Sequence, residues 1–292
     1  AALAKLGRPS VSADIVSAVA PHARRVALAD AGLSFIRRAR ENAHDYFVTN
    51  LTASAYEGWV KLGSAARAIL LFDPLTGASG LARSRDDEVY LQLAPGESLI
   101  LRTSARPLPS SLASWLYRQP GTPLPLSGPW SVTFLKGGPD LPPAVQATAL
   151  KSWTDLGGDE AKRFGGTARY RLEFDAPTES APGWLLDLGD VRESALVRLN
   201  GNPIATAWSI PFRIRLDAAL LKPGKNVLEL DVTNLAANRI RDLDQRKVNW
   251  KIMREINFVN INYKPFDASG WPLTPSGLLG PVTLTPLKGI SP

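Results

Sequence analysis

Residues 183–234 read GWLLDLGDVRESALVRLNGNPIATAWSIPFRIRLDAALLKPGKNVLELDVTN. Apolar and polar side chains alternate through this stretch, and turn signals interrupt it at short intervals, as in half-buried strands. Asn200-Gly201 is the strongest hairpin signal, since a type I′ turn needs positive φ at both central residues. Lys222-Pro223-Gly224 gives a second tight turn before an alternating strand at 226–233. The stretch therefore predicts an all-β sandwich and not an α/β enzyme core.

The composition of the chain suits many short strands joined by turns. Its 292 residues are enough for one large domain or two ordinary ones, and 45% are hydrophobic, so a sizeable core can form. The absence of cysteine excludes disulfides, cysteine metal sites and thiol catalysis. No run of 18 consecutive apolar residues occurs. We therefore expect no transmembrane helix and no membrane partner.

The charge of the chain is basic but not concentrated. The net charge is +7, from 34 Lys and Arg against 27 Asp and Glu, and the excess is spread over both halves. Nucleic-acid binding needs a basic face in one place. The local run of basic residues at 239–254 is interrupted by acids, as in a solvated loop. We expect no nucleic-acid partner.

Residues 1–30 and 105–129 differ from the strand-rich segments that follow them. The first is Ala-rich and can hold a short helix at 12–19, ended by Pro21. We expect it to be the remnant of a preceding domain. The second is a Pro-rich connector, mostly extended, with one short helix expected around Leu112–Tyr117.

The two remaining segments predict two β domains. Residues 31–104 predict a small antiparallel β-sandwich, in which Pro95-Gly96 makes a tight hairpin connection. Its expected strands are 33–40, 45–51, 56–62, 68–74, 88–93 and 98–103. Residues 130–292 predict a second, larger β domain. Within it, 152–166 is expected to be a loop and 235–276 a long, irregular polar loop. A loop as long as the second is more often functional or tied down than idle.

Short motifs of the opening stretch occur in a fixed order. They are Leu188-Gly189, Leu199-Asn200-Gly201, Pro211-Phe212, Lys222-Pro223-Gly224, Asn226 and Thr233-Asn234. In this order they resemble the galactose-binding-type jelly roll of glycoside hydrolases, which families 2 and 106 share. The flanking segments 70–77, 90–103, 152–174 and 263–284 are similar to the C-terminal portion of family 106, the bacterial α-L-rhamnosidases. The resemblance covers most of residues 33–287.

The resemblance implies an accessory role. In family 106 a (β/α)₈ barrel with acidic residues and calcium carries catalysis, and residues 1–30 would be the remnant of that barrel. The matched positions of this chain lie outside the barrel, so no catalytic residue is carried over. The implied function is the C-terminal, carbohydrate-binding part of a periplasmic or secreted α-L-rhamnosidase-like hydrolase, with carbohydrate and the barrel as partners. A stand-alone carbohydrate-binding module and a purely structural sandwich without ligand remain alternatives.

The residues themselves give no catalytic centre. Glycoside hydrolysis needs two carboxyl groups facing each other across the bond, and no such pair stands out. His22 and His44 are the only histidines, and both suit surface positions better than a triad or zinc site. Phosphate-loop, dinucleotide and nucleophile-elbow motifs are missing. We expect no required cofactor.

Sugar binding needs flat aromatic faces and planar polar groups. Trp153 and Trp208 lie in or beside loops, and Trp208 precedes Pro211-Phe212 where jelly rolls form a binding edge. Arg192, Asn238 and Arg239 can supply hydrogen bonds to hydroxyl groups. For each, packing within the loop or against another domain is the competing interpretation. Related jelly rolls hold a structural calcium ion, and the weak candidates for it are Asp155, Asp159 and Glu160.

Overall fold

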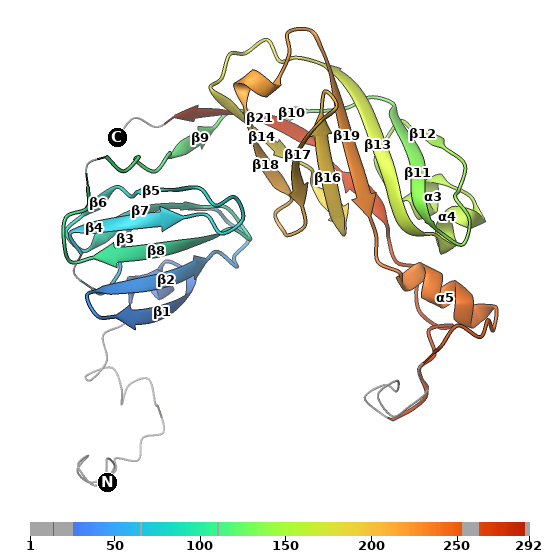
Figure 1. Ribbon diagram of the computed structural model, residues 1–292, viewed down its shortest axis with the longest axis horizontal. Coiled ribbons are helices and arrows are strands. Elements are labelled where there is room, and N and C mark those ends of the chain that lie inside the picture. The colour runs from blue at the N-terminus through green and yellow to red at the C-terminus, as the bar shows by residue number, and fades with distance from the viewer. Residues whose placement is uncertain (1–13, 15–25, 65, 110, 253–262, 290–292) are drawn as a thin grey trace. The chain divides into compact units, whose positions relative to one another are not determined.

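The computed structural model describes residues 14, 26–64, 66–109, 111–252 and 263–289 (Figure 1). The chain forms two compact units: unit 1 is Ala1–Tyr117 with Ser291–Pro292, and unit 2 is Arg118–Ile290. The division falls inside the Pro-rich segment 105–129. The helix expected at 12–19 lies outside the described residues, Asp14 excepted. Within the described residues, no helix has the length and apolar composition to cross a membrane.

Unit 1 is an antiparallel sandwich of two sheets, and all six strands predicted for it are present. The larger sheet has the order β1 (Ser34–Arg40), β2 (Ala43–Thr49), β8 (Ser98–Ser104), β4 (Ala68–Phe72), β5 (Ser79–Leu81). The smaller sheet has the order β3 (Tyr56–Lys61), β7 (Glu88–Leu93), β6 (Ser84–Arg85). Every second residue of β7 and β8 is buried, so the alternation seen in the sequence faces the core from both sheets. Leu28 of the short helix α2 (Ala27–Asp30) is also buried.

The connection between β7 and β8 is not the predicted hairpin. The two strands belong to different sheets, so the chain crosses the sandwich at Pro95-Gly96. Asn50 is fully buried there and donates from Nδ2 to the carbonyl of Leu93 over 3.0 Å. The backbone carbonyl of Asn50 accepts from the Gly96 amide over 2.8 Å. The tight turn at Pro95-Gly96 is confirmed, but its long-range partner Asn50 decides which sheet the next strand joins.

The helix expected around Leu112–Tyr117 is also absent. The Trp115 amide donates to the carbonyl of Leu81 over 2.8 Å, so this segment runs beside β5. A Cβ on Gly80 would lie 2.6 Å from the Trp115 nitrogen, which shows how close the two backbones are. Pairing with a strand edge satisfies the backbone groups that a helix would have satisfied internally.

Unit 2 is a larger antiparallel sandwich, and with unit 1 it confirms the all-β fold class. One sheet has the order β12 (Val145–Ala147), β11 (Trp130–Gly138), β13 (Gly165–Asp175), β19 (Lys225–Thr233), β16 (Ser194–Leu199), β17 (Asn202–Ala207). The other has the order β10 (Leu124–Pro125), β21 (Thr283–Gly289), β14 (Gly183–Asp187), β18 (Arg213–Asp217), with β9 (Arg118–Pro120) also paired to β21. The strands β15 (Asp190–Arg192) and β20 (Gly277–Gly280) pair to form a separate two-stranded ribbon. Buried side chains such as Trp130, Tyr170, Trp184 and Leu230 form one core between these sheets.

In unit 2 the sequence predicts the hairpin turn correctly but does not predict the helices. Asn200 and Gly201 have φ of 54° and 83°, as the predicted type I′ turn between β16 and β17 requires. The segments predicted as irregular loops contain helices instead. These are α3 (Trp153–Leu156), α4 (Asp159–Arg163) and α5 (Ala237–Gln245), and a 3₁₀ turn, η2 (Ala218–Leu220), precedes β19.

Candidate functional site

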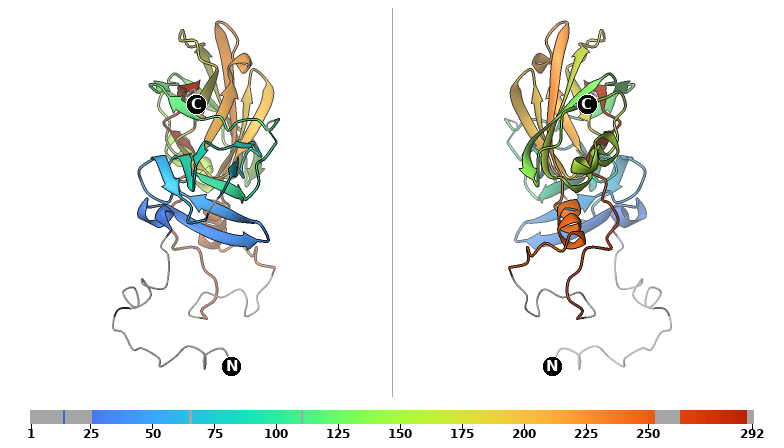
Figure 2. Two further views of the ribbon diagram at one scale, coloured as in Figure 1. Left: turned by 90° about the vertical axis from the view of Figure 1, so that its left-hand side faces the viewer. Right: turned by 90° about the vertical axis from the view of Figure 1, so that its right-hand side faces the viewer.

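The register of unit 2 brings most of the residues singled out in the sequence to one end of its sandwich. Thr167 pairs with Thr233, and Thr233 pairs with Ser194, so β13 and β16 start where β19 ends. In the facing sheet, Asp187 at the end of β14 pairs with Arg213 at the start of β18. We call this the loop end, because it carries the connections 188–193, 208–212 and 234–276. The opposite end, with turns at 200–201 and 222–224, is the turn end. Helix α5 lies beyond the end of β19 in all views (Figure 1, Figure 2).

Trp208 is the exposed aromatic residue that the sequence predicted at a binding edge. It is 65% exposed, and Ile210 beside it is 70% exposed. The loop is anchored behind them, because Phe212 is buried and its carbonyl accepts from the Leu188 amide over 2.9 Å. The loop end therefore presents an indole ring to solvent from a fixed base, as stacking on a sugar ring requires.

Arg192 lies on the same end in β15. Its Nη2 donates to Asp190 over 2.7 Å, and both side chains are 39% exposed. That hydrogen bond is the main cause that raises the pKa of Arg192. Nε of Arg192 is buried and has no hydrogen-bond partner among the described residues. The exposed part of the side chain, and not the buried Nε, can reach a ligand hydroxyl.

Trp153 and Asn238 support the loop end from inside. Trp153 is 0% exposed, and its ring packs edge-on against Phe134 and Phe164 with centroids 5.6 and 5.8 Å away. Asn238 is 1% exposed; its Nδ2 donates to the Thr274 carbonyl and its Oδ1 accepts from the Thr274 amide, each over 2.8 Å. Neither side chain offers a surface to a sugar. The prediction of direct sugar contact is wrong for both.

Arg239 follows Asn238 on α5 and is held in an ion-pair network. Its Nη1 lies 3.1 Å from Asp242, which also accepts from Nη2 of Arg246 over 2.6 Å. Burial raises the pKa of Asp242, but the hydrogen bond from Arg246 and the charges of Arg246, Arg239 and Arg163 together outweigh it and leave the pKa below its ordinary value. Arg239 therefore stabilises α5 through this carboxylate, and its role toward sugar stays a prediction.

The proposed calcium ligands do not come together. Asp159 is bonded to Lys162 over 2.9 Å and its side chain is 88% exposed. Within the ranges that the structure describes, no group of three or more His, Cys, Asp or Glu side chains is arranged to hold a metal ion. Asp155, Asp159 and Glu160 are thus neighbours in the sequence without forming a shared cage.

The loop end also carries a pocket that the sequence does not predict. It has a volume of about 530 Å³ and lies between residues 150–155 and 273–279. Its walls are Leu150, Leu273, Pro275 and Leu279, with Lys151, Ser152, Thr154 and Asp155 as polar groups. The local signal was limited to Ser152, whose Oγ caps α3 by accepting from the Thr154 amide over 3.3 Å. Neither segment contains a sequence signal that predicts contact with the other segment.

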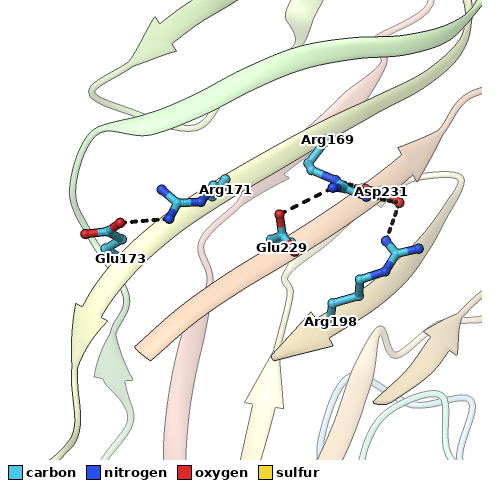
Figure 3. Close-up of polar contacts among 6 residues, drawn as sticks. All are labelled: Arg169, Arg171, Glu173, Arg198, Glu229 and Asp231. Carbon is cyan, nitrogen blue, oxygen red and sulfur yellow. Dashed lines mark hydrogen bonds and ion pairs between the residues drawn. The ribbon is translucent and has the colours of Figure 1, made fainter. Parts of the chain in front are cut away.

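The outer face of the six-stranded sheet carries a compact charge network (Figure 3). Asp231 on β19 accepts two hydrogen bonds from Arg169 on β13, at 2.6 and 3.0 Å, and another from Arg198 on β16. Glu229 lies 3.4 Å from Arg169, and Arg171 is paired with Glu173 over 2.7 Å. Burial raises the pKa of Asp231, but the bonds from the two arginines outweigh it, so the pKa lies below its ordinary value. Each carboxylate has an arginine partner, which suits a structural role.

Comparisons with known proteins connect the chain with glycoside hydrolases. No protein-family model matches it. The structure titled rhamnosidase from Novosphingobium sp. PP1Y is similar over 94% of this chain, with 26% identity and a TM-score of 0.67. A protein of Formosa agariphila named "Putative beta-glucuronidase" is 35% identical over an alignment of 186 residues that covers 56% of this chain. The likeness to a beta-glucuronidase of Bifidobacterium dentium is weaker, with 18% identity over 56% of this chain, 30% of that chain and a TM-score of 0.39.

The chain corresponds to a small part of these proteins. It spans 26% of the rhamnosidase chain and 16% of the Formosa protein. The findings thus connect a two-unit β fold with carbohydrate-acting proteins that are several times longer.

Proposed function

We propose that this chain is the accessory, carbohydrate-binding part of a larger bacterial α-L-rhamnosidase-like glycoside hydrolase. The observation that carries the proposal is the similarity to the rhamnosidase over 94% of this chain but only 26% of that one. A similarity that covers 94% of the chain includes both units. Family 106 membership, rhamnose as the sugar and a catalytic barrel as the physical partner belong to the proposal. So does a periplasmic or secreted location.

The exposed loop end supports the binding role. Trp208 and Ile210 together give an apolar surface at a fixed position, and Arg192 adds a hydrogen-bond donor at the same end. Flat apolar surface next to a planar polar group is what recognition of a sugar ring needs. The same surface can alternatively pack against another domain, in which case the chain is a structural module without ligand.

Three paired carboxylates of the loop end, Asp187, Asp190 and Asp242, argue against a role for themselves in hydrolysis by this chain alone. Asp187 is bonded to Arg213 over 2.6 Å and Asp190 to Arg192 over 2.7 Å. The pKa of Asp242 is lowered, whereas the general acid of a glycosidase needs a raised pKa. Acids held in this way serve as structural anions and not as proton donors.

The test is binding of rhamnose-containing oligosaccharides by titration calorimetry, with glucuronate-containing ones as a second series. Trp208→Ala should weaken affinity about tenfold, or roughly 1.4 kcal/mol, because the stacking face is lost. Phe47→Ala, which removes a 42% exposed aromatic side chain from unit 1, should leave affinity unchanged. Absence of binding to every oligosaccharide would favour the structural module. Hydrolysis of a rhamnoside by this chain alone would overturn the accessory role.

A further inference from the structure

The pocket between residues 150–155 and 273–279 is built by hydrogen bonds between segments that are far apart in the sequence. The Trp153 amide donates to the Ser276 carbonyl over 3.0 Å. In return, the Ser276 amide donates to Oγ of Ser152 over 2.9 Å. These bonds fix the two walls relative to each other before any ligand arrives. A pocket formed in advance loses less conformational entropy when it binds.

A second layer keeps the walls in place. Asn238 of α5 binds both the amide and the carbonyl of Thr274, each over 2.8 Å, and so holds the 273–279 segment from behind. On the other side, the buried Trp153 packs against Phe134 and Phe164. Asn238 is therefore a positioning residue for the pocket. Its burial, which excludes direct contact with a sugar, is what this role requires.

The lining combines apolar walls with two charged groups that the protein does not use elsewhere. Leu150, Leu273, Pro275 and Leu279 supply the apolar surface. Lys151 and Asp155 line the same pocket and are exposed. Within the described ranges, neither side chain makes an ion pair or hydrogen bond, unlike most charged groups of the loop end. An ammonium donor and a carboxylate acceptor are thus available for hydroxyl groups.

The size and charge of the pocket restrict the ligand. Its volume of about 530 Å³ falls in the range typical of small-molecule sites, roughly 300–1,000 Å³. Lys151 and Asp155 have opposite charges, so the two together give the pocket no net charge that would offset the cost of desolvating a charged ligand. Opposite charges in one pocket therefore favour a neutral ligand. The four apolar side chains favour a ligand with one apolar edge.

We propose that this pocket binds one neutral saccharide unit that has an apolar edge, as a 6-deoxyhexose has at its methyl group. The inference rests on the carbohydrate-binding function proposed above and adds a second contact site to the Trp208 surface. Lys151 and Asp155 would bind ring hydroxyls, and the leucines would cover the methyl group and the C–H face.

The experiment is an NMR titration of the full chain with ¹³C-methyl-labelled leucine. The probes are the matched pairs L-rhamnose with L-mannose and D-fucose with D-galactose, which differ only in the hydroxyl at C6, and D-galacturonate. At least one deoxy sugar should shift the methyl signals of Leu150, Leu273 and Leu279 but not that of Leu141, an exposed leucine that does not line the pocket. Its hydroxylated partner should bind at least about threefold more weakly, since the apolar wall leaves the C6 hydroxyl unpaired. Galacturonate should bind weakest.

Variants separate this inference from the proposed function. Asp155→Asn and Lys151→Ala should each weaken the deoxy sugar about fivefold. Lys222→Ala, at the turn end, should change nothing. If the three leucine signals do not move, or if both pocket variants bind as wild type, the pocket is not a sugar site. In that case oligosaccharide binding that is lost in Trp208→Ala would still uphold the proposed function. Leucine shifts without any effect of Trp208→Ala would uphold the pocket alone.

Discussion

The two ends of the sandwich in unit 2 are joined by the same strands but are built by different means. At the turn end, tight turns at 200–201 and 222–224 follow from residues next to each other in the chain, and Asn200 joins them by bonding to Asn226 over 2.9 Å and to the Val227 amide over 3.0 Å. At the loop end, the decisive bonds join residues 124 positions apart, as between Ser152 and Ser276. The exposed Trp208 and the pocket both lie at the loop end. Tight turns and bonds across fewer than about 30 positions therefore form the turn end, whereas bonds across more than 100 positions shape the end that carries the candidate binding surfaces.

The largest expected effect tests this difference with two glycines that share positive φ. Gly277, at the loop end, has φ of +97°, and a Cβ there would lie 2.2 Å from Oη of Tyr170 and 2.8 Å from the Trp153 ring. Gly224, at the turn end, has φ of +79° and nothing within 4 Å. Gly277→Ala should lower the free energy of unfolding by about 3–5 kcal/mol, through backbone strain plus overpacking. Gly224→Ala should cost only the strain, about 1 kcal/mol. Urea denaturation measures both, and equal losses would show that the loop end yields as easily as the turn end.

Much of the turn end could be predicted from the sequence, because its signals are local. The alternation along 226–233 and the Asn200-Gly201 pair gave strands and turn together. The six strands of unit 1 followed from the same alternation. The connection at Pro95-Gly96 did not, because a turn signal carries no information about which sheet the next strand joins.

The loop end could be predicted only in outline. Helix α5 was missed because ANRIRDLDQ has few apolar residues, and it is held by Asn238 and by ion pairs to Asp242. Trp153 is expected in a loop but begins the short helix α3 and is fully buried, because segments far away in the sequence cover it. Trp208 stands exposed as expected. The pocket could not be predicted at all, since its two walls are about 120 residues apart in the sequence and meet only in the folded structure.

The next effect compares two buried asparagines, one at each end. Asn226 is 0% exposed; its Nδ2 donates to the Lys222 carbonyl over 2.8 Å, and its Oδ1 accepts from the Lys222 amide over 2.9 Å. Asn238 clamps Thr274 in the same way. Either Asn→Ala change should cost about 2–3 kcal/mol, because buried backbone groups lose their partners. Asn238→Ala alone should also weaken deoxy-sugar binding in the leucine NMR titration. A similar loss of binding in Asn226→Ala would mean that lowered stability, and not pocket geometry, is responsible.

The smallest effect compares two acids on the paired strands β13 and β19. Asp231 lies near the loop end of β19, is 10% exposed and is bonded to Arg169 and Arg198, whereas Asp175 at the turn end pairs with Lys225 while 72% exposed. Asp231→Asn should cost about 1–2 kcal/mol at neutral pH, since charge-assisted bonds become neutral ones. Asp175→Asn should cost less than about 0.5 kcal/mol, as exposed ion pairs do.

The lowered pKa of Asp231 predicts how its contribution to stability changes at acid pH. The two arginines overcome the effect of burial and lower the pKa of Asp231, so the unfolded chain takes up its proton at a higher pH than the folded chain does. The stabilisation is complete well above the unfolded pKa of about 4 and is lost as pH falls through the folded pKa. Denaturation of wild type and Asp231→Asn from pH 7 to pH 2 should therefore give a stability difference that shrinks below about pH 4. A stability difference that stays constant would mean that the stabilising contacts of Arg169 and Arg198 do not depend on the charge of Asp231. The charge network in the six-stranded sheet would then act through packing and not through electrostatics.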